Sequence, residues 1–349
     1  MRDIRHVKRI LVRATNWIGD SIMTLPALME IRRNFPHAQI SVLLRPWVRP
    51  IFESLPYVDQ IINYDKKKGM VQNLAEFVRI TSLLRAKRFD MAILFQNAFE
   101  AALIAFLSGI RVRLGHDTDG RGFLLSHPVK KGKGQHQIRN YLDLLKGIGL
   151  EVEEMDPLLS IKGEYIANAQ SVLKENDIEP GEFVIALAPG AIYGPAKRWP
   201  AEYFAIIGDW IRKRWGAKVL IMGSDRERDV CSHVQAMMKE GSLNLCGKTS
   251  LGTSMGIIKN CNMLVSNDSG LMHVGAALGV PTVAIFGSTD PQATGPRGAY
   301  CRIIKHDIPC SPCFRRECPY DLECLYSVRP EDVWEKMEEL QNEASSLPG

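Results

Sequence analysis

The sequence predicts an α/β protein made of two doubly wound domains, each with a parallel sheet covered by helices. Short apolar runs typical of buried parallel strands alternate with helical patterns along most of the chain. The alternation restarts in the region of residues 155–180, where proline and glycine cluster. A length of 349 residues also favours two domains. We therefore expect an N-terminal domain over residues 1–165 and a C-terminal domain over 166–329.

In the N-terminal domain, strands and helices are expected in strict alternation. Helices are placed where apolar residues recur every third or fourth position, as Ile22, Leu25, Leu28 and Ile31 do. The expected strands cover 8–14, 39–44, 60–64, 91–95 and 111–114, and the expected helices cover 21–34, 47–54, 71–85, 98–107 and 135–147.

The C-terminal domain repeats the same pattern. Its expected strands cover 183–188, 218–222, 243–245, 263–266 and 282–286, and its expected helices cover 165–176, 201–215, 226–239, 251–260 and 273–278. Two such domains in tandem are expected to leave a cleft where their strand ends face each other. A last helix over 330–343 begins with a proline in its first turn and is expected to pack back on the N-terminal domain.

The composition indicates an ordinary globular chain without a secretory signal or a membrane-spanning run. The most apolar stretch, residues 91–110, is interrupted by Gln96, Asn97 and Glu100. We therefore expect a cytoplasmic protein or one peripheral to a membrane. Residues 1–160 contain 24 Lys and Arg against 16 Asp and Glu, a net charge of +8 within a chain of net +5. This asymmetry favours a polyanionic partner such as an acidic membrane surface or a phosphorylated glycan, while nucleic acid is disfavoured because no RNA-binding or zinc-finger signature is present. The alternative is a solvated basic face, which we prefer for lysines 66–68 taken alone.

Two loops after predicted strands have the character of phosphate-binding turns. The first, residues 189–200, contains Gly190, Gly194 and Lys197, and the second, residues 267–273, begins Asn-Asp-Ser-Gly. A strand that ends in a small-residue turn and enters a helix presents backbone N–H groups and the positive end of the helix dipole. The two turns together predict a diphosphate site at the carboxyl edge of the sheet.

Each residue of these turns also has a plain structural interpretation. Lys197 could be an ordinary exposed loop lysine, although beside a second phosphate turn we favour a charge-neutralising role. Asp268 could be the N-cap of the helix, which is compatible with ordering a phosphate turn made by Ser269, Gly270 and Leu271. His273 is expected to pack or brace the turn rather than act as a base.

Two acidic residues are further candidates. Glu227 follows Gly223 at the end of the next strand, where a carboxylate can accept bonds from ribose hydroxyls or simply favour the first turn of a helix. Asp20 follows the first strand and could act as a general base towards an acceptor hydroxyl. Its structural alternative is again an N-cap, here for the helix over 21–34.

Two common nucleotide signatures are absent. No G-x-G-x-x-G follows the first strand, which disfavours a dehydrogenase. The segment from Gly241 to Thr249 nearly spells a P-loop but has one residue too many between its glycines, so we interpret it as a turn.

The eight cysteines fall into two groups. Four are scattered and are expected to be core or surface thiols: Cys231, Cys246, Cys261 and Cys301. The other four cluster with the spacing C-x2-C-x4-C-x5-C: Cys310, Cys313, Cys318 and Cys324. Such a cluster could hold zinc or an iron–sulfur cluster, but its spacing matches no standard zinc pattern, so reduced thiols and no bound metal are the default expectation.

With these motifs assembled, the chain resembles the family 9 glycosyltransferases. The motifs that carry the resemblance are residues 17–20 (Trp-Ile-Gly-Asp), the core of the first turn at 194–200 (Gly-Pro-Ala-Lys-Arg-Trp-Pro) and residues 267–273. The similarity extends from about residue 8 to 298. It implies a GT-B fold, with two Rossmann-like domains that bind the acceptor through the N-terminal one and a nucleotide sugar through the C-terminal one.

The resemblance also implies a reaction and roles for residues. The implied donor is ADP-L-glycero-β-D-manno-heptose, and the implied acceptor is the first heptose of the lipopolysaccharide inner core, at the cytoplasmic face of the inner membrane. Transfer would invert the anomeric centre without a metal or another cofactor. Asp20 corresponds to the proposed base, Lys197 to the loop lysine, Glu227 to the ribose-binding glutamate and 268–271 to the diphosphate turn.

Three other functions remain open at this point. A transferase of the same fold could use another sugar or acceptor, as heptosyltransferase I does. A GT-B-fold sugar epimerase would need no acceptor. A non-catalytic metal- or redox-sensing module could be built on the cysteine cluster, which departs from the best-known members of the family.

Overall fold

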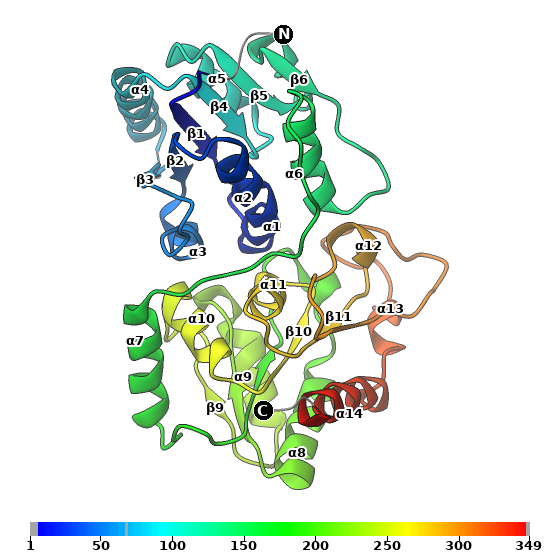
Figure 1. Ribbon diagram of the computed structural model, residues 1–349. Helices are drawn as coiled ribbons and strands as arrows, with labels where there is room; N and C mark the ends of the chain where they lie inside the picture. The colour runs from blue at the N-terminus through cyan, green and yellow to red at the C-terminus, as the bar shows by residue number, and fades with distance from the viewer. Residues whose placement is uncertain (1–5, 67–68, 347–349) are drawn as a thin grey trace. The chain divides into compact units, whose positions relative to one another are not determined.

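The computed structural model describes residues 6–66 and 69–346, and the chain divides into two units, Met1–Ser160 and Ile161–Gly349 (Figure 1). Each unit is built on one six-stranded sheet in which every strand pair is parallel. Figure 1 shows the strands of each unit inside a layer of helices. The predicted class of two doubly wound α/β domains is confirmed.

The first unit alternates strands and helices as the sequence predicted. Its strands are β1 (Arg9–Arg13), β2 (Gln39–Leu44), β3 (Gln60–Asn63), β4 (Met91–Leu94), β5 (Val112–His116) and β6 (His127–Val129). Its helices are α1 (Ile18–Met23), α2 (Leu25–Asn34), α3 (Arg49–Phe52), α4 (Met70–Lys87), α5 (Phe99–Leu107) and α6 (Gln137–Lys146).

The second unit repeats this order and then extends it. Its strands are β7 (Val184–Ala188), β8 (Lys218–Ile221), β9 (Leu243–Asn244), β10 (Met263–Asn267), β11 (Thr282–Ile285) and β12 (Cys301–Ile304). Its helices are α7 (Gly163–Lys174), α8 (Ala201–Trp215), α9 (Arg228–Met237), α10 (Leu251–Lys259), α11 (Gly270–Ala277), α12 (Pro291–Thr294), α13 (Glu323–Tyr326) and α14 (Pro330–Ser346).

Both sheets have the same strand order. The first runs β3-β2-β1-β4-β5-β6. The second, read from its β9 edge, runs β9-β8-β7-β10-β11-β12, in which each strand number is six higher. The direction of winding reverses between β1 and β4 in the first sheet and between β7 and β10 in the second. In open parallel sheets, ligands bind at the carboxyl ends of the strands beside such a switch point. The fold thus singles out the loops after β1, β7 and β10.

The helix expected over 21–34 is two helices. The first, α1, starts at Ile18, and the second, α2, starts at Leu25 with Pro26 in its first turn. Between them the hydroxyl of Thr24 donates to the carbonyl of Ser21 at 2.6 Å. Because proline has no N–H to continue the ladder, the chain begins a new helix there. The earlier start of α1 places Asp20 inside its first turn.

Several short elements carried too little pattern to be predicted. Strand β6 has three residues and β12 has four, and both lie at the edges of their sheets. The helices α12 and α13 have four residues each. The units divide after Ser160, so that α7 belongs wholly to the second unit, whereas the sequence pattern predicts the boundary at residue 165, inside this helix.

The C-terminal helix corrects another expectation. It is predicted to pack on the N-terminal domain, whereas it belongs to the second unit and packs there against α8, β11 and β12. Its buried side chains recur at helical spacing and join the core of the second sheet: Val333, Trp334, Met337 and Leu340. The ring centre of Trp334 lies 4.5 Å from that of Trp215 in α8, with the two rings tilted by 35°. The apolar face of α14 is therefore an integral part of the second unit's core.

None of the helices in the described part of the chain is long and apolar enough to cross a bilayer.

Candidate active site

The two predicted phosphate turns of the second unit are joined by an ion pair. The Nζ of Lys197 lies 2.5 Å from Oδ2 of Asp268, and only 13% and 6% of the two side chains are exposed. Lys197 follows β7 and Asp268 follows β10, so the pair spans the switch point of the sheet. The hydroxyl of Thr289 also donates to Oδ2 of Asp268 at 2.6 Å. The lysine is thus held in one place at the sheet edge.

A buried asparagine fixes the two turns to each other. The side chain of Asn267 accepts a bond from the N–H of Trp199 at 2.9 Å and donates to the carbonyl of Pro189 at 2.7 Å. Asn267 is fully buried. Sequence reasoning included it in the motif but assigned it no role. The sequence did contain a signal for it, because an amide side chain at the last position of a buried strand needs hydrogen-bond partners.

The start of α11 presents backbone donors at this edge. Ser269 occupies the N-cap position and its side chain makes no capping bond, because its hydroxyl pairs with that of Ser266 at 3.1 Å. The helix begins at Gly270 and continues through Leu271. A helix start of this kind attracts an anion. Asp268 is not the N-cap, contrary to its structural interpretation, because its carboxylate binds Lys197 and Thr289.

His273 lies one turn into α11 and is buried. This position agrees with a packing role.

The loop after β8 brings Glu227 to the same edge. Its Oε2 accepts bonds from the N–H and the hydroxyl of Ser224 at 2.8 and 2.7 Å, which completes a capping box. Its other oxygen, Oε1, would lie 2.2 Å from a Cβ at Gly190. Only glycine at position 190 therefore lets this carboxylate sit against the backbone of the lysine loop. Gly223 has a similar function, since a Cβ there would meet the sulfurs of Cys246 and Cys231 at 2.9 and 3.0 Å.

The structure thus brings most of the predicted donor residues together at the carboxyl ends of β7, β8 and β10. Oε2 of Glu227 has a structural role at the start of its own helix, because it bonds Ser224. Oε1 faces Gly190. Gly194 is required for another reason, since a Cβ there would lie 2.3 Å from the carbonyl oxygen of Arg316.

In the first unit, Asp20 lies in the first turn of α1 and is partly buried. The N-cap position belongs to Trp17, so Asp20 does not cap the helix as its structural interpretation required. The hydroxyl of Tyr141 in α6 lies 3.5 Å from Oδ1 of Asp20. Burial, followed by the charge of Asp20, raises the pKa of Tyr141 well above its ordinary value. The phenol is therefore a neutral donor towards this carboxylate.

A group of charged residues near the carboxyl ends of β1, β2 and β3 was missed by sequence reasoning. Arg13 and Arg45 are 4% and 6% exposed, and burial, followed by the charge of Arg45, lowers the pKa of Arg13 to about 10. The guanidinium of Arg45 lies 4.6 Å from the ring centre of Tyr64, whose hydroxyl bonds Glu100. Two buried cations so close to one edge favour an anionic ligand there.

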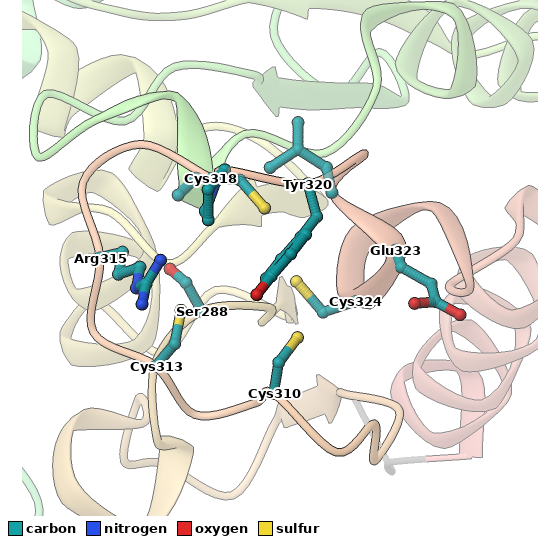
Figure 2. A pocket seen from close by; sticks show the side chains of 11 residues that line it. Ser288, Cys310, Cys313, Arg315, Cys318, Tyr320, Glu323 and Cys324 are labelled. Carbon is teal, nitrogen blue, oxygen red and sulfur yellow. The ribbon is translucent and has the colours of Figure 1, made fainter.

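The four clustered cysteines line one cavity of about 260 Å³ in the second unit (Figure 2). All are reduced, and Cys310 is exposed whereas Cys324 is buried. Burial and the other three thiols raise the pKa of Cys324 to about 11. As the structure stands, no group of three or more His, Cys, Asp or Glu within residues 6–66 and 69–346 is arranged to hold a metal ion.

The scattered cysteines are different. Three are buried, and each donates to a backbone carbonyl: Cys231, Cys246 and Cys261. They are core thiols, as expected.

Comparison with known proteins agrees with this geometry. Residues 77–323 match the model of the family described as glycosyltransferase family 9 (heptosyltransferase). Lipopolysaccharide heptosyltransferase 2 of Escherichia coli K12 is 31% identical over 313 residues, covering 85% of this chain and 88% of that protein. Lipooligosaccharide heptosyltransferase 2 of Haemophilus influenzae is 29% identical over 346 residues, covering 95% and 99%.

A solved structure shows the same architecture. The structure of E. coli ADP-heptose lipopolysaccharide heptosyltransferase II superposes with a TM-score of 0.83 at 26% identity, covering 97% of this chain and all of that one. The GT-B expectation is confirmed by this match over both units. The chain therefore belongs to glycosyltransferase family 9, the heptosyltransferase family.

Proposed function

We propose that the chain is an inverting heptosyltransferase that moves L-glycero-D-manno-heptose from ADP-heptose to the first heptose of the lipopolysaccharide inner core. The observation that carries the proposal is the Lys197–Asp268 pair, which spans the switch point beside the start of α11. The chain is also similar, over nearly its whole length, to proteins named heptosyltransferase 2.

In this proposal the second unit binds the donor. The diphosphate lies against the start of α11, where the N–H groups near Gly270 and Leu271 and the helix dipole favour negative charge. Lys197 contributes a further donor, because an ammonium has three N–H bonds and Asp268 uses only one. Glu227 accepts the hydroxyls of the ADP ribose through Oε1, while Oε2 stays with Ser224.

The chemical step is a single displacement. Asp20 accepts the proton of the acceptor hydroxyl as that oxygen attacks the anomeric carbon of the heptose. The bond from this carbon to the diphosphate breaks on the opposite face, so a β-linked donor gives an α-linked product. ADP leaves with its developing charge stabilised by Lys197 and the start of α11. These groups supply positive charge to the leaving group without a catalytic metal.

Release of ADP from ADP-heptose tests this function, with three acceptor conditions compared in parallel. We expect release only with Kdo–lipid A that already carries one heptose. Release with unmodified Kdo–lipid A would instead assign the addition of the first heptose, as in heptosyltransferase I. Conversion of the sugar without any acceptor would indicate an epimerase and would overturn the proposal.

We also propose that the protein acts at the cytoplasmic face of the inner membrane, where its lipid-linked acceptor is exposed. Helix α4 supports this, because its apolar side chains are left exposed at positions that share one side of the helix: Met70, Val71, Leu74 and Val78. Lys66 precedes this helix, and the neighbouring lysines 67 and 68 in the sequence lie outside the described residues. An apolar stripe that follows the cation of Lys66 in the sequence suits an anionic bilayer surface.

Vesicle binding tests the contact through α4. We expect Leu74→Glu/Val78→Glu to lose binding to vesicles that contain anionic lipid, because two carboxylates would replace apolar contacts in the bilayer. Turnover with a soluble, delipidated acceptor should be unchanged. A variant that still co-sediments like the parent protein would exclude α4 as the contact.

A further inference from the structure

The cysteine loop is a long segment without regular structure that surrounds its own thiols. Between β12 and α13, residues 305–322 form no helix or strand, which is unusual within a compact domain. Figure 2 shows the side chains of Cys310, Cys313, Cys318 and Cys324 directed towards the same cavity. Three soft ligands from the loop and one from the start of α13 therefore converge on one space.

The lining of the cavity suits the charge of a metal–thiolate centre. A divalent ion with four thiolates carries a net charge of about −2, which a nearby cation stabilises. Arg315, which lies between Cys313 and Cys318 in the sequence, supplies such a cation in the cavity lining. The one carboxylate in the lining, Glu323, points away from the thiols in Figure 2. The ligand set is thus all sulfur, which selects thiophilic metals over magnesium or calcium.

The same loop holds the lysine loop of the donor site. The carbonyl of Arg316 accepts a bond from the N–H of Ala196 at 3.1 Å, next to Lys197. The hydroxyl of Tyr193 donates to the carbonyl of Phe314 at 2.7 Å, and the ammonium of Lys197 lies 4.8 Å from the ring centre of Tyr193. Ordering of the cysteine loop therefore fixes the backbone that presents Lys197.

A second attachment reaches Asp268 from the other side. The N–H groups of Cys313 and Phe314 donate to the carbonyl of Ser288 at 3.0 and 2.7 Å. Ser288 adjoins Thr289, whose hydroxyl bonds Asp268. Both members of the Lys197–Asp268 pair are thus connected to the cysteine loop.

We propose that Cys310, Cys313, Cys318 and Cys324 bind one thiophilic divalent metal ion in a structural site that braces the lysine loop. The thiols bind as thiolates and release their protons to solvent. Because the thiols are not arranged as a ready-made shell, the loop must draw the sulfurs to about 2.3 Å from the ion. This site does not depend on the proposed transferase activity, and its failure would leave that proposal intact.

Metal binding to the full-length chain tests the site, with Zn²⁺ and the spectroscopic probe Co²⁺. We expect about one ion per chain and a Co²⁺ spectrum of a tetrahedral thiolate site. Cys310→Ser/Cys313→Ser should lose both. The matched control, Cys261→Ser/Cys301→Ser, changes two cysteines outside the cavity and should keep both. Absence of the thiolate spectrum in the reduced parent protein, or equal binding by both double variants, would overturn the proposal.

Limited proteolysis gives a readout that needs no variant. Arg315 and Arg316 are exposed in the loop, so trypsin can cut there when the loop opens. We expect Zn²⁺ to slow cleavage at these sites by about ten-fold or more, as binding adds to local stability. Cleavage after the exposed Lys130 and Lys131 of the first unit should be unchanged and serves as the internal control. Equal rates in the loop with and without Zn²⁺ would contradict a bracing metal.

Discussion

Asp20→Asn is expected to reduce heptose transfer by about 10²- to 10⁴-fold, the usual contribution of a general base. The amide keeps the size of the side chain but cannot accept the proton of the acceptor hydroxyl. The affinity for ADP should be unchanged, because the residues assigned to the donor all lie in the second unit and Asp20 lies in the first. Turnover and calorimetric ADP binding, measured on the same preparation, separate the two effects.

A loss of stability must be distinguished from a loss of the base. Asp20 is the acidic residue in the first turn of α1, where a negative charge is worth about 0.3–1 kcal/mol. Glu164→Gln removes the acidic charge at the first turn of α7, which is exposed whereas Asp20 is partly buried, and serves as the control for the loss of a helix-start charge. It should shift thermal unfolding by a similar small amount and leave turnover intact. Near-normal transfer by Asp20→Asn would exclude this carboxylate as the base.

Most of the fold could be predicted from the alternation of strand and helix patterns along the sequence. Parallel strands buried on both faces are short apolar runs, and the helices between them have their own period, so each unit could be recognised without knowing its neighbours. The edge strands β6 and β12 were missed because neither is a continuous apolar run: β6 contains Pro128, and β12 begins with Cys301 and Arg302. The packing of α14 was missed for another reason. Its apolar face predicts burial but not which core it enters.

The site could be predicted in its parts but not in its contacts. The glycines and the lysine of the two turns were identified because they follow strands. That Lys197 binds Asp268, 71 residues later, follows from β7 and β10 being neighbours, which local sequence does not encode. Arg13 escaped notice because it ends a short strand that also begins with an arginine, the exposed Arg9, and the sequence does not show which of the two is buried. Its burial near Arg45 becomes visible only when β1 pairs with β2.

Lys197→Ala is expected to lower kcat/KM for ADP-heptose by about 10²- to 10³-fold, comparable to removal of one donor from an oxyanion hole. The variant loses the charge that stabilises the leaving diphosphate. It also leaves the 6%-exposed carboxylate of Asp268 without its cation, next to the place where the diphosphate binds. Breaking a buried pair costs up to about 3–5 kcal/mol of stability, so thermal unfolding should also shift. The exposed pair Lys213–Glu240 provides the control Lys213→Ala, which should cost at most about 1 kcal/mol and no activity.

The double variant Lys197→Ala/Asp268→Asn separates the two causes. Neutralising Asp268 removes the repulsion, so ADP affinity and stability should recover in part relative to Lys197→Ala. Turnover should remain low, because no cation returns to the leaving group. If ADP affinity does not recover, Asp268 does not face the diphosphate, and the ion pair serves only to order the loop. If turnover recovers as well, the charge of Lys197 is not needed at the transition state, and the start of α11 must stabilise the departing ADP alone.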